Sequence, residues 1–163
     1  MTLLLDIAPE AQLYFDHLRQ EFFPKHQLRD TAHLTLLYQI HERPEKTIEK
    51  LQSINSQPFQ ISATGLLPYT TGNAIRMESE QLQALHRTLK QTFKGRISRR
   101  DLVRYRPHIT VQLHVTAFKA QRTLEALHQS CKPFSFSAQG MSLWLKDKKQ
   151  AEQLWQQSFA PLP

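Results

Sequence analysis

The tetrapeptide His33-Leu34-Thr35-Leu36 occurs a second time, 75 positions later, as His108-Ile109-Thr110-Val111. A second phrase is repeated at the same offset, because Pro58-Phe59-x-x-Ser62-Ala63-x-Gly65 returns as Pro133-Phe134-x-x-Ser137-Ala138-x-Gly140. Two separate phrases that keep one spacing indicate a structural unit used twice. The sequence therefore predicts two similar halves, each carrying a histidine and a threonine on one strand.

The size and composition of the chain fit a soluble globular protein. It has 163 residues, of which 40% are hydrophobic and 21% are charged. A chain of this length buries about 70% of its unfolded surface. We expect a single domain over residues 1–163, made of two repeated lobes at approximately 1–70 and 71–163. Because the symmetry is then internal, we expect a monomer.

Hydrophobic periodicity and turn residues predict an α+β fold. Predicted strands cover residues 2–7, 32–39, 58–67, 73–78, 107–115 and 134–145. Predicted helices cover residues 9–22, 44–55, 79–93 and 117–130, with a further helix at 151–157 and a loop at 94–106. Each half then runs strand–helix–strand–helix–strand. We expect a bilobal, duplicated fold in which two antiparallel-type sheets face a central cleft about a pseudo-twofold axis, with the helices outside.

Alternation along the two motif strands predicts which side chains line that cleft. Residues two apart on a strand share a face. Leu34 and Leu36 should therefore point toward the helices. The opposite, cleft-facing set comprises His33, Thr35, Leu37 and Gln39 in the first copy, and His108, Thr110, Gln112 and His114 in the second.

The charge of the chain favours an anionic partner. The formal net charge is +7 and the isoelectric point is about 9.8, which suits RNA, a nucleotide or a phosphorylated small molecule. Basic residues crowd the segment just before the second motif: Lys94, Arg96, Arg99, Arg100, Arg104 and Arg106.

Targeting and redox signals are weak in this sequence. The apolar stretch Leu3-Leu4-Leu5 is interrupted by Asp6 and is too short for a signal peptide. No run approaches the roughly 20 apolar residues that cross a bilayer, so we expect no membrane association. The single cysteine, Cys131, excludes an internal disulfide and favours a reducing, cytoplasmic location, where it would be a structural thiol.

The paired motifs suit acid–base chemistry at a phosphate. A threonine hydroxyl can donate to a phosphate oxygen, and an imidazole exchanges protons near neutral pH. Two such pairs across a twofold axis would flank one phosphorus atom, with one histidine as general base and the other as general acid. Threonine hydroxyls and nearby cations would stabilise the developing charge without a metal ion.

Both copies resemble the His-x-Thr/Ser-x motifs of the two-histidine (2H) phosphoesterase superfamily, which includes the LigT-like 2'-5' RNA ligases and cyclic phosphodiesterases. The similarity extends over most of the chain, since the element order and duplicated halves also fit. It implies a bilobal α+β fold. It further implies opening of 2',3'-cyclic phosphates on nucleotides or RNA ends to 2'-phosphates, or joining and cleavage of 2'-5' linkages, without a cofactor or metal. The compact chain resembles bacterial members.

Carried over to this sequence, the resemblance makes His33 and His108 the acid–base pair, in an order that stays open. Thr35 and Thr110 would bind the phosphate. Weaker substrate-binding candidates precede or follow the motifs: Arg104, Tyr105, Arg106 and Tyr38. A cation there would attract phosphate and an aromatic ring could stack a base. The competing interpretations are a solvated loop for the arginines and a core position for Tyr38.

Three alternatives stay open. The chain could be an inactive basic RNA- or nucleotide-binding module on the same fold, or an RNA ligase that runs the same chemistry in reverse. A zinc site from His33, His108 and His114 lacks an accompanying acidic or cysteine ligand at suitable spacing. The six histidines outside the motifs are expected at the surface or on helix faces: His17, His26, His41, His86, His114 and His128.

Overall fold

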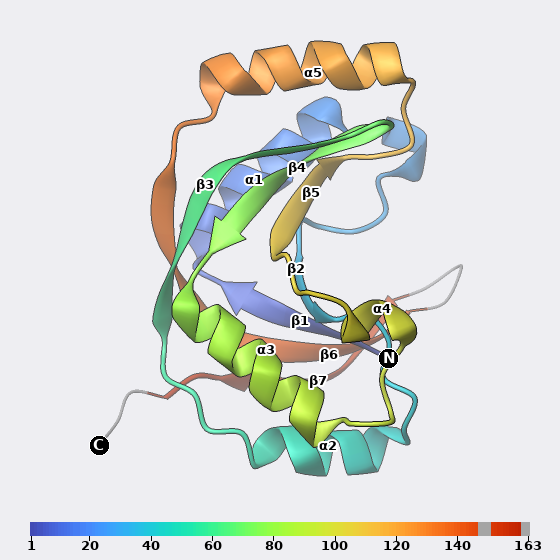
Figure 1. Ribbon diagram of the computed structural model, residues 1–163, viewed down its shortest axis with the longest axis vertical. Coiled ribbons are helices and arrows are strands. Elements are labelled where there is room, and N and C mark those ends of the chain that lie inside the picture. Colours follow the sequence, from blue (N-terminus) through green and yellow to red (C-terminus); the bar gives the residue numbers. More distant parts are fainter. Residues whose placement is uncertain (147–150, 161–163) are drawn as a thin grey trace.

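The computed structural model describes residues 1–146 and 151–160, which form an α+β fold (Figure 1). The strands are β1 (Thr2–Ile7), β2 (Leu34–Leu37), β3 (Phe59–Tyr69), β4 (Gly72–Glu78), β5 (His108–Gln112), β6 (Phe134–Lys146) and β7 (Ala151–Ser158). The helices are α1 (Pro9–Phe22), α2 (Pro44–Gln52), α3 (Glu80–Thr92), α4 (Arg99–Leu102) and α5 (Ala117–Ser130), with a 3-10 turn η1 (Lys25–Gln27). The predicted strand–helix–strand–helix–strand order is present in β1-α1-β2-α2-β3 and in β4-α3-β5-α5-β6, and α4 and β7 are additions to the second series.

The strands form one closed sheet, and the expectation of two separate sheets is wrong. The order is β1-β2-β5-β4-β3-β6-β7, and a further pairing of β1 with β6 closes six strands into a ring. All pairings are antiparallel. Closure comes from β6, which is long enough to pair with β3 through its first part and with β1 through its second.

The pairing pattern is unchanged when β1, β2 and β3 are exchanged with β4, β5 and β6. Two pairs map onto themselves: β2 meets β5 at Leu34 and Ile109, and β3 meets β6 with Ile61 across from Phe136. In both cases the partners are 75 positions apart, which is the offset of the sequence repeat. A single ring therefore holds two equivalent sets of three strands.

The irregularities of the sheet also occur in equivalent places. The β1–β2 register shifts between Leu3 and Leu4, and the β4–β5 register shifts between Asn73 and Ala74. Each shift leaves an extra residue on the motif strand, Leu36 in one case and Val111 in the other. A bulge of this kind bends the strand and re-aims the side chains beyond it.

Helices cover the ring on two sides (Figure 1). α1 packs on β5 and α5 on β3 and β4, whereas α3 packs on β2 and β3, and α2 contacts β7. The first helix of each half thus covers the motif strand of the other half. Local signals agree with these helices, because Pro44 occupies the first turn of α2 and the Ser79 side chain accepts from the Leu82 N–H at the start of α3.

The hydrophobic core lies between the helices and the sheet. It includes the apolar motif residues Leu34, Leu36, Ile109 and Val111, all 0–1% exposed, as the alternation predicts. Cys131 is half-buried at the end of α5, where its Sγ accepts from the Tyr14 hydroxyl at 3.2 Å. Within the described part of the chain, no helix has the length and apolarity to cross a bilayer.

Two predicted elements differ from the structure. Residues 151–157 are strand rather than helix, because β7 pairs along the free edge of β6. The two adjacent apolar residues Leu154 and Trp155 are too few to distinguish a helical from a strand period. The segment 94–106, predicted as a loop, contains the short helix α4. The division into lobes at residue 70 stays a prediction.

Candidate active site

Both motif histidines are held in the same way. His33 lies immediately before β2, and His108 is the first residue of β5. The Nδ1 atom of His33 lies 2.9 Å from the Thr31 carbonyl oxygen, and that of His108 lies 2.7 Å from the Arg106 carbonyl oxygen. Because a carbonyl can only accept, each Nδ1 carries the proton. The neutral imidazole therefore presents an unprotonated Nε2, which is the atom a general base needs.

The two motif copies meet across β2 and β5. Leu34 is the register partner of Ile109. In an antiparallel pair the register runs in opposite directions from such a point. His33 then lies across from Thr110, and Thr35 lies across from His108. Each histidine is thereby paired with the threonine of the other copy.

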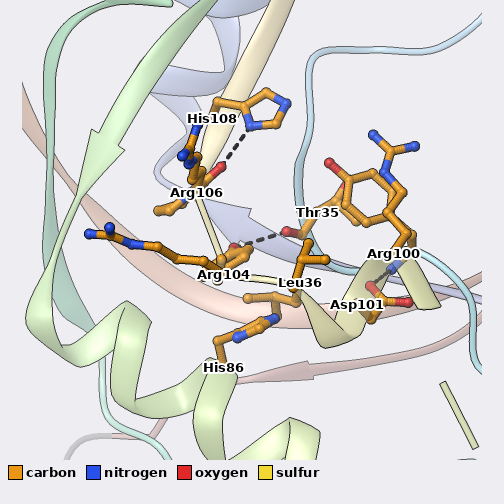
Figure 2. A pocket seen from close by; sticks show the side chains of 12 residues that line it. Thr35, Leu36, His86, Arg100, Asp101, Arg104, Arg106 and His108 are labelled. Atoms are coloured by element: carbon orange, nitrogen blue, oxygen red, sulfur yellow. Dashed lines mark hydrogen bonds between the residues drawn. The ribbon is translucent and has the colours of Figure 1, made fainter. Parts of the chain in front are cut away.

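A cavity of about 160 Å³ lies beside the second histidine (Figure 2). It is lined by Thr35, Leu36, Tyr38, His86, Arg100, Asp101, Val103, Arg104, Tyr105, Arg106, Pro107 and His108. The cavity is thus lined by residues of both motif copies, Thr35 and His108. Neither His33 nor Thr110 lines it. Six of the eight residues proposed from the sequence contribute to this cavity.

Tyr105 contributes to the cavity wall mainly as a support. Its hydroxyl donates to the Thr35 carbonyl oxygen at 2.9 Å, and its ring stacks on His86 with centroids 3.8 Å apart and planes at 4°. Burial raises the pKa of the Tyr105 hydroxyl, with a smaller contribution from Tyr38. One ring face and the hydroxyl are therefore already occupied, which leaves less of Tyr105 for a nucleobase than the sequence suggests.

Tyr38 is half-buried and is covered by an arginine that sequence reasoning did not single out. The Arg100 guanidinium lies 3.6 Å from the centroid of the Tyr38 ring, a cation–π contact. The neighbouring Asp101 is buried and accepts from the N–H groups of Tyr38 and Gln39 and from the Ser98 hydroxyl. Asp101 thus fixes α4 against the end of β2 and so places Arg100 at the cavity.

Arg104 and Arg106 are exposed at the cavity. In Figure 2 the Arg104 side chain extends away from Thr35 and His108. Both residues stay candidates for substrate contact, together with Arg100. The density of basic residues in 94–106 was the sequence signal for all three. What the sequence does not give is which of them turns toward the cavity.

Two further residues next to His108 carry no sequence signal. Tyr69, at the end of β3, places its ring edge-on to the His108 ring with centroids 6.1 Å apart. Burial is the main reason that the pKa of Tyr69 is raised. Arg76 of β4 is the register partner of His108 and is exposed. Both lie on strands that come close to His108 only through the sheet pairing, which the linear sequence does not reveal.

The expectation that the cleft-facing set continues beyond each motif is wrong. After the bulges at Leu36 and Val111, Leu37 and Gln112 are fully buried. Gln112 donates to the Thr123 hydroxyl at 2.7 Å and accepts from the Asn73 side chain at 2.9 Å. Gln39 and His114 lie beyond the strand ends and are not buried, and His114 has a left-handed backbone with φ of 58°. The extra residue shifts the alternation by one position.

The environment of His33 differs from that of His108. Burial and the nearby Lys146 ammonium lower the pKa of His33, and Arg19 adds to this effect. The Thr31 carbonyl and Asp30 act in the opposite direction. Lys146 and Asp30 themselves form an ion pair at 3.1 Å. The net result favours the neutral imidazole at position 33.

One histidine outside the two motifs is buried on a helix face. His86 on α3 is 4% exposed, and burial together with Lys90 lowers its pKa to about 4. It is therefore a neutral stacking partner of Tyr105. Among residues 1–146 and 151–160, no three histidine, cysteine or acidic side chains are grouped as a metal site would require, so the zinc alternative has no ligand cluster in this part of the chain.

Comparison with known proteins identifies the family and the fold of this chain. The sequence profile of the 2'-5' RNA ligase superfamily matches residues 6–150. The fold resembles E. coli LigT complexed with 3'-AMP (TM-score 0.65, 17% identity, 98% of this chain and 97% of that one). It also resembles TT0787 of Thermus thermophilus (TM-score 0.62, 18% identity, 98% of each chain).

A structure described as a phosphoesterase is similar as well, with a TM-score of 0.64, 19% identity and 98% coverage of both chains. No curated protein matches the chain by sequence. At these identities the structural neighbours establish the fold, whereas the match over residues 6–150 establishes the family. The chain belongs to the 2'-5' RNA ligase superfamily, whose members are 2H phosphoesterases.

Proposed function

We propose that this protein is a metal-independent phosphodiesterase that opens 2',3'-cyclic phosphates of nucleotides or RNA ends to 2'-phosphates. The observation that carries the proposal is the matched state of the two motif histidines. Both Nδ1 atoms donate to a backbone carbonyl two residues earlier, so both Nε2 atoms are available for proton transfer. A histidine retained only for packing would not need the same tautomer in both copies.

In the proposed reaction water attacks the phosphorus atom in line with the bond to O3'. One histidine takes the proton from the attacking water, and the P–O3' bond breaks. The other histidine, protonated beforehand, gives its proton to O3', and the product keeps the phosphate on O2'. Each such proton transfer contributes about 10²- to 10⁴-fold in rate. Atoms and charge balance without a cofactor or metal ion.

For hydrolysis of the cyclic phosphate, we assign His33 as the general base and His108 as the general acid. Burial and Lys146 lower the pKa of His33, which keeps its imidazole neutral and able to accept a proton. Ligation would keep these roles, because a 5'-hydroxyl replaces water as the nucleophile and O3' is again the leaving group. Cleavage of a 2'-5' linkage is the reverse step, in which the 3'-hydroxyl attacks and O5' leaves, and there microscopic reversibility exchanges the two roles.

The phosphate itself would be held by hydroxyls and cations. Thr35 and Thr110 flank the two histidines across β2 and β5, and hydroxyl donors stabilise charge that develops on phosphate oxygens. Arg100, Arg104 and Arg106 line the cavity beside His108. Tyr38, Tyr105 and Tyr69 supply the aromatic surface near it.

The substrate class proposed here is a nucleotide or RNA end with a cyclic phosphate or a 2'-5' linkage. The net charge of +7 suits a polyanion. E. coli LigT, which has the same fold, has been crystallised with 3'-AMP, ATP and NADP+. We further propose that the two equivalent strand sets are copies of one unit and that the chain acts as a monomer.

The test is hydrolysis of the four nucleoside 2',3'-cyclic monophosphates in EDTA by wild type, His33→Ala and His108→Ala. We expect a 2'-phosphate from wild type and a loss of at least 10²-fold in kcat for either variant, with nucleotide binding retained. His128→Ala, an exposed histidine on α5, is the matched control and should keep full activity.

Wild-type inactivity on these nucleotides and on 2'-5' linked RNA would count against the enzyme. The remaining candidate would then be a basic RNA-binding module, which the cluster of arginines in 94–106 favours. Its signature is RNA affinity that falls steeply with salt and that is insensitive to substitution of His33 or His108.

A further inference from the structure

Arg19 of α1 is a buried cation that the proposed reaction does not use. Its side chain is 6% exposed. One guanidinium nitrogen donates to the Thr110 carbonyl oxygen at 2.8 Å, and the other donates to the Asp30 carbonyl oxygen at 3.4 Å. The guanidinium also lies 4.3 Å from the centre of the Phe23 ring. One side chain thus bonds to the backbone of both motif regions.

Two other polar side chains of α1, Gln12 and Asp16, bond to the loop before β2. Asp16 accepts from the Ala32 N–H at 2.5 Å, and the Gln12 side-chain amide donates to the Ala32 carbonyl oxygen at 2.8 Å. Gln12 also donates to Asp16 at 3.0 Å. Gln12, Asp16 and Arg19 lie on one face of the helix. The loop that carries Thr31, whose carbonyl fixes the His33 tautomer, is therefore held from both ends.

Burial of the Arg19 guanidinium costs free energy, because the charge loses its hydration. An ionised group out of water loses hydration that only good hydrogen bonds replace. Arg19 retains one buried nitrogen, Nε, without a partner, and burial lowers its pKa despite the nearby Asp30 and Asp16. A neutral side chain of similar length would avoid the cost of burying a charge. The planar fork of arginine is what allows bonds to two carbonyls at once.

We propose that Arg19 is a positioning residue that ties the loop before His33 to the strand after His108, and so sets the two histidines against one another. Its counterpart on the other side of the ring is Tyr105, whose hydroxyl donates to the Thr35 carbonyl oxygen. Each motif threonine carbonyl is thus bonded by a side chain from the other half of the chain. The proposal rests on the proposed function for its kinetic part and on geometry alone for its spectroscopic part.

Arg19 acts on His33 in two separable ways. Through Asp30 it restrains the loop, and through its charge it lowers the pKa of His33, in addition to burial and Lys146 and against Asp30. Arg19→Lys keeps the positive charge but loses the planar guanidinium that bonds to two carbonyls. Arg19→Met loses both the charge and the guanidinium. The two variants therefore separate position from charge.

The experiment compares wild type, Arg19→Lys and Arg19→Met at a temperature where far- and near-UV circular dichroism shows all three folded. The matched control is Arg122→Met, an exposed arginine on α5. Nitrogen-15 NMR of the imidazoles gives the tautomer and pKa of His33 and His108 without any substrate. Steady-state kinetics on a 2',3'-cyclic mononucleotide gives kcat and KM.

We expect both Arg19 variants to lose kcat by about 10- to 100-fold, the usual effect of a misplaced catalytic group, with KM within about 2-fold of wild type. The Nδ1–H tautomer of His33 should become mixed in both. The pKa of His33 should rise in Arg19→Met and stay in place in Arg19→Lys. Arg122→Met should match wild type in every measurement.

An unchanged His33 tautomer in both variants would overturn the proposal, as would a fall in activity carried entirely by KM. If Arg19→Met does not fold, Arg19→Lys alone decides, because the proposal requires its tautomer to be mixed. A wild type without turnover would contradict the proposed function, whereas the NMR arm would still decide the role of Arg19.

Discussion

Leu34 of β2 and Ile109 of β5 are register partners at the point where the two motif copies meet. Both side chains are completely buried, on the opposite face of the strands from the histidines. This contact places each histidine across from the threonine of the other copy. Packing in the core and geometry in the site are therefore set by the same pair of residues.

Truncation of this contact should destabilise the protein. Leu34→Ala removes a completely buried side chain next to Ile109 and leaves a cavity, so we expect a loss of about 3 kcal/mol in the free energy of unfolding. Urea denaturation followed by circular dichroism measures it. Leu102→Ala, at an exposed leucine of α4, is the control and should change stability by less than about 0.5 kcal/mol. Equal losses in the two variants would contradict the assigned burial.

The motif strands show how far sequence periodicity reaches. Alternation correctly puts Leu34 and Ile109 in the core, because the pleat is regular there. It fails beyond the bulges at Leu36 and Val111, since each adds a residue that no partner strand matches. Nothing in an apolar run such as Leu36-Leu37 distinguishes a bulge from regular strand. A register shift is a property of two strands, whereas periodicity describes only one.

Only part of the candidate site could be predicted from the sequence, because sequence patterns describe single segments and not contacts between strands. The repeated motif identifies His33 and His108 because both copies lie in the chain as contiguous phrases. Tyr69 and Arg76 come close to His108 because β4 pairs with β5 and β3 pairs with β4. Arg100 reaches Tyr38 because Asp101 bonds to the end of β2. The Tyr69–His108 and Arg100–Tyr38 contacts each join the two halves of the chain, which the sequence-based expectation of two separate sheets kept apart.

Substitution of Gln112 tests where its side chain lies. A cleft-facing glutamine would affect KM, whereas the observed one bonds to Asn73 and Thr123 in the core. Gln112→Ala leaves those partners unsatisfied, so we expect a loss of about 2–4 kcal/mol in stability and an unchanged KM below the unfolding transition. Gln39→Ala, at an exposed position, should alter neither quantity. A raised KM with full stability would show that Gln112 faces the substrate.

Removal of Lys146 should shift the pH dependence of activity. The Lys146 ammonium is the main charge that lowers the pKa of His33, after burial. Lys146→Met removes it and also frees Asp30, which acts in the opposite direction. Both effects raise the pKa of His33. Because His33 must be deprotonated to act as the base, the acid limb of kcat/KM should move to higher pH.

A pH profile of kcat/KM across the acid and alkaline limbs measures this shift, and the control is Lys132→Met at an exposed lysine. The control should reproduce the wild-type limb. A limb that moves to lower pH in Lys146→Met would contradict the assignment of His33 as the base. An alkaline limb that moves alone would assign the base to His108.

The arginines of the basic segment should contribute unequally to substrate binding. Arg100 is held over Tyr38 at the cavity, whereas Arg104 extends away from Thr35 and His108 (Figure 2). Loss of one charge-assisted bond to phosphate costs about 1.5 kcal/mol or more, so we expect Arg100→Met to raise KM about 10-fold with little change in kcat. Arg104→Met should raise KM less than about 2-fold. Because both variants remove one positive charge, a general electrostatic effect would raise KM equally in Arg100→Met and Arg104→Met.

The salt dependence of activity on an RNA end separates the same two arginines. The slope of log(kcat/KM) against log salt should fall by about one unit in Arg100→Met alone. An equal fall in both variants would place the phosphate contact outside the Tyr38–Arg100 pair.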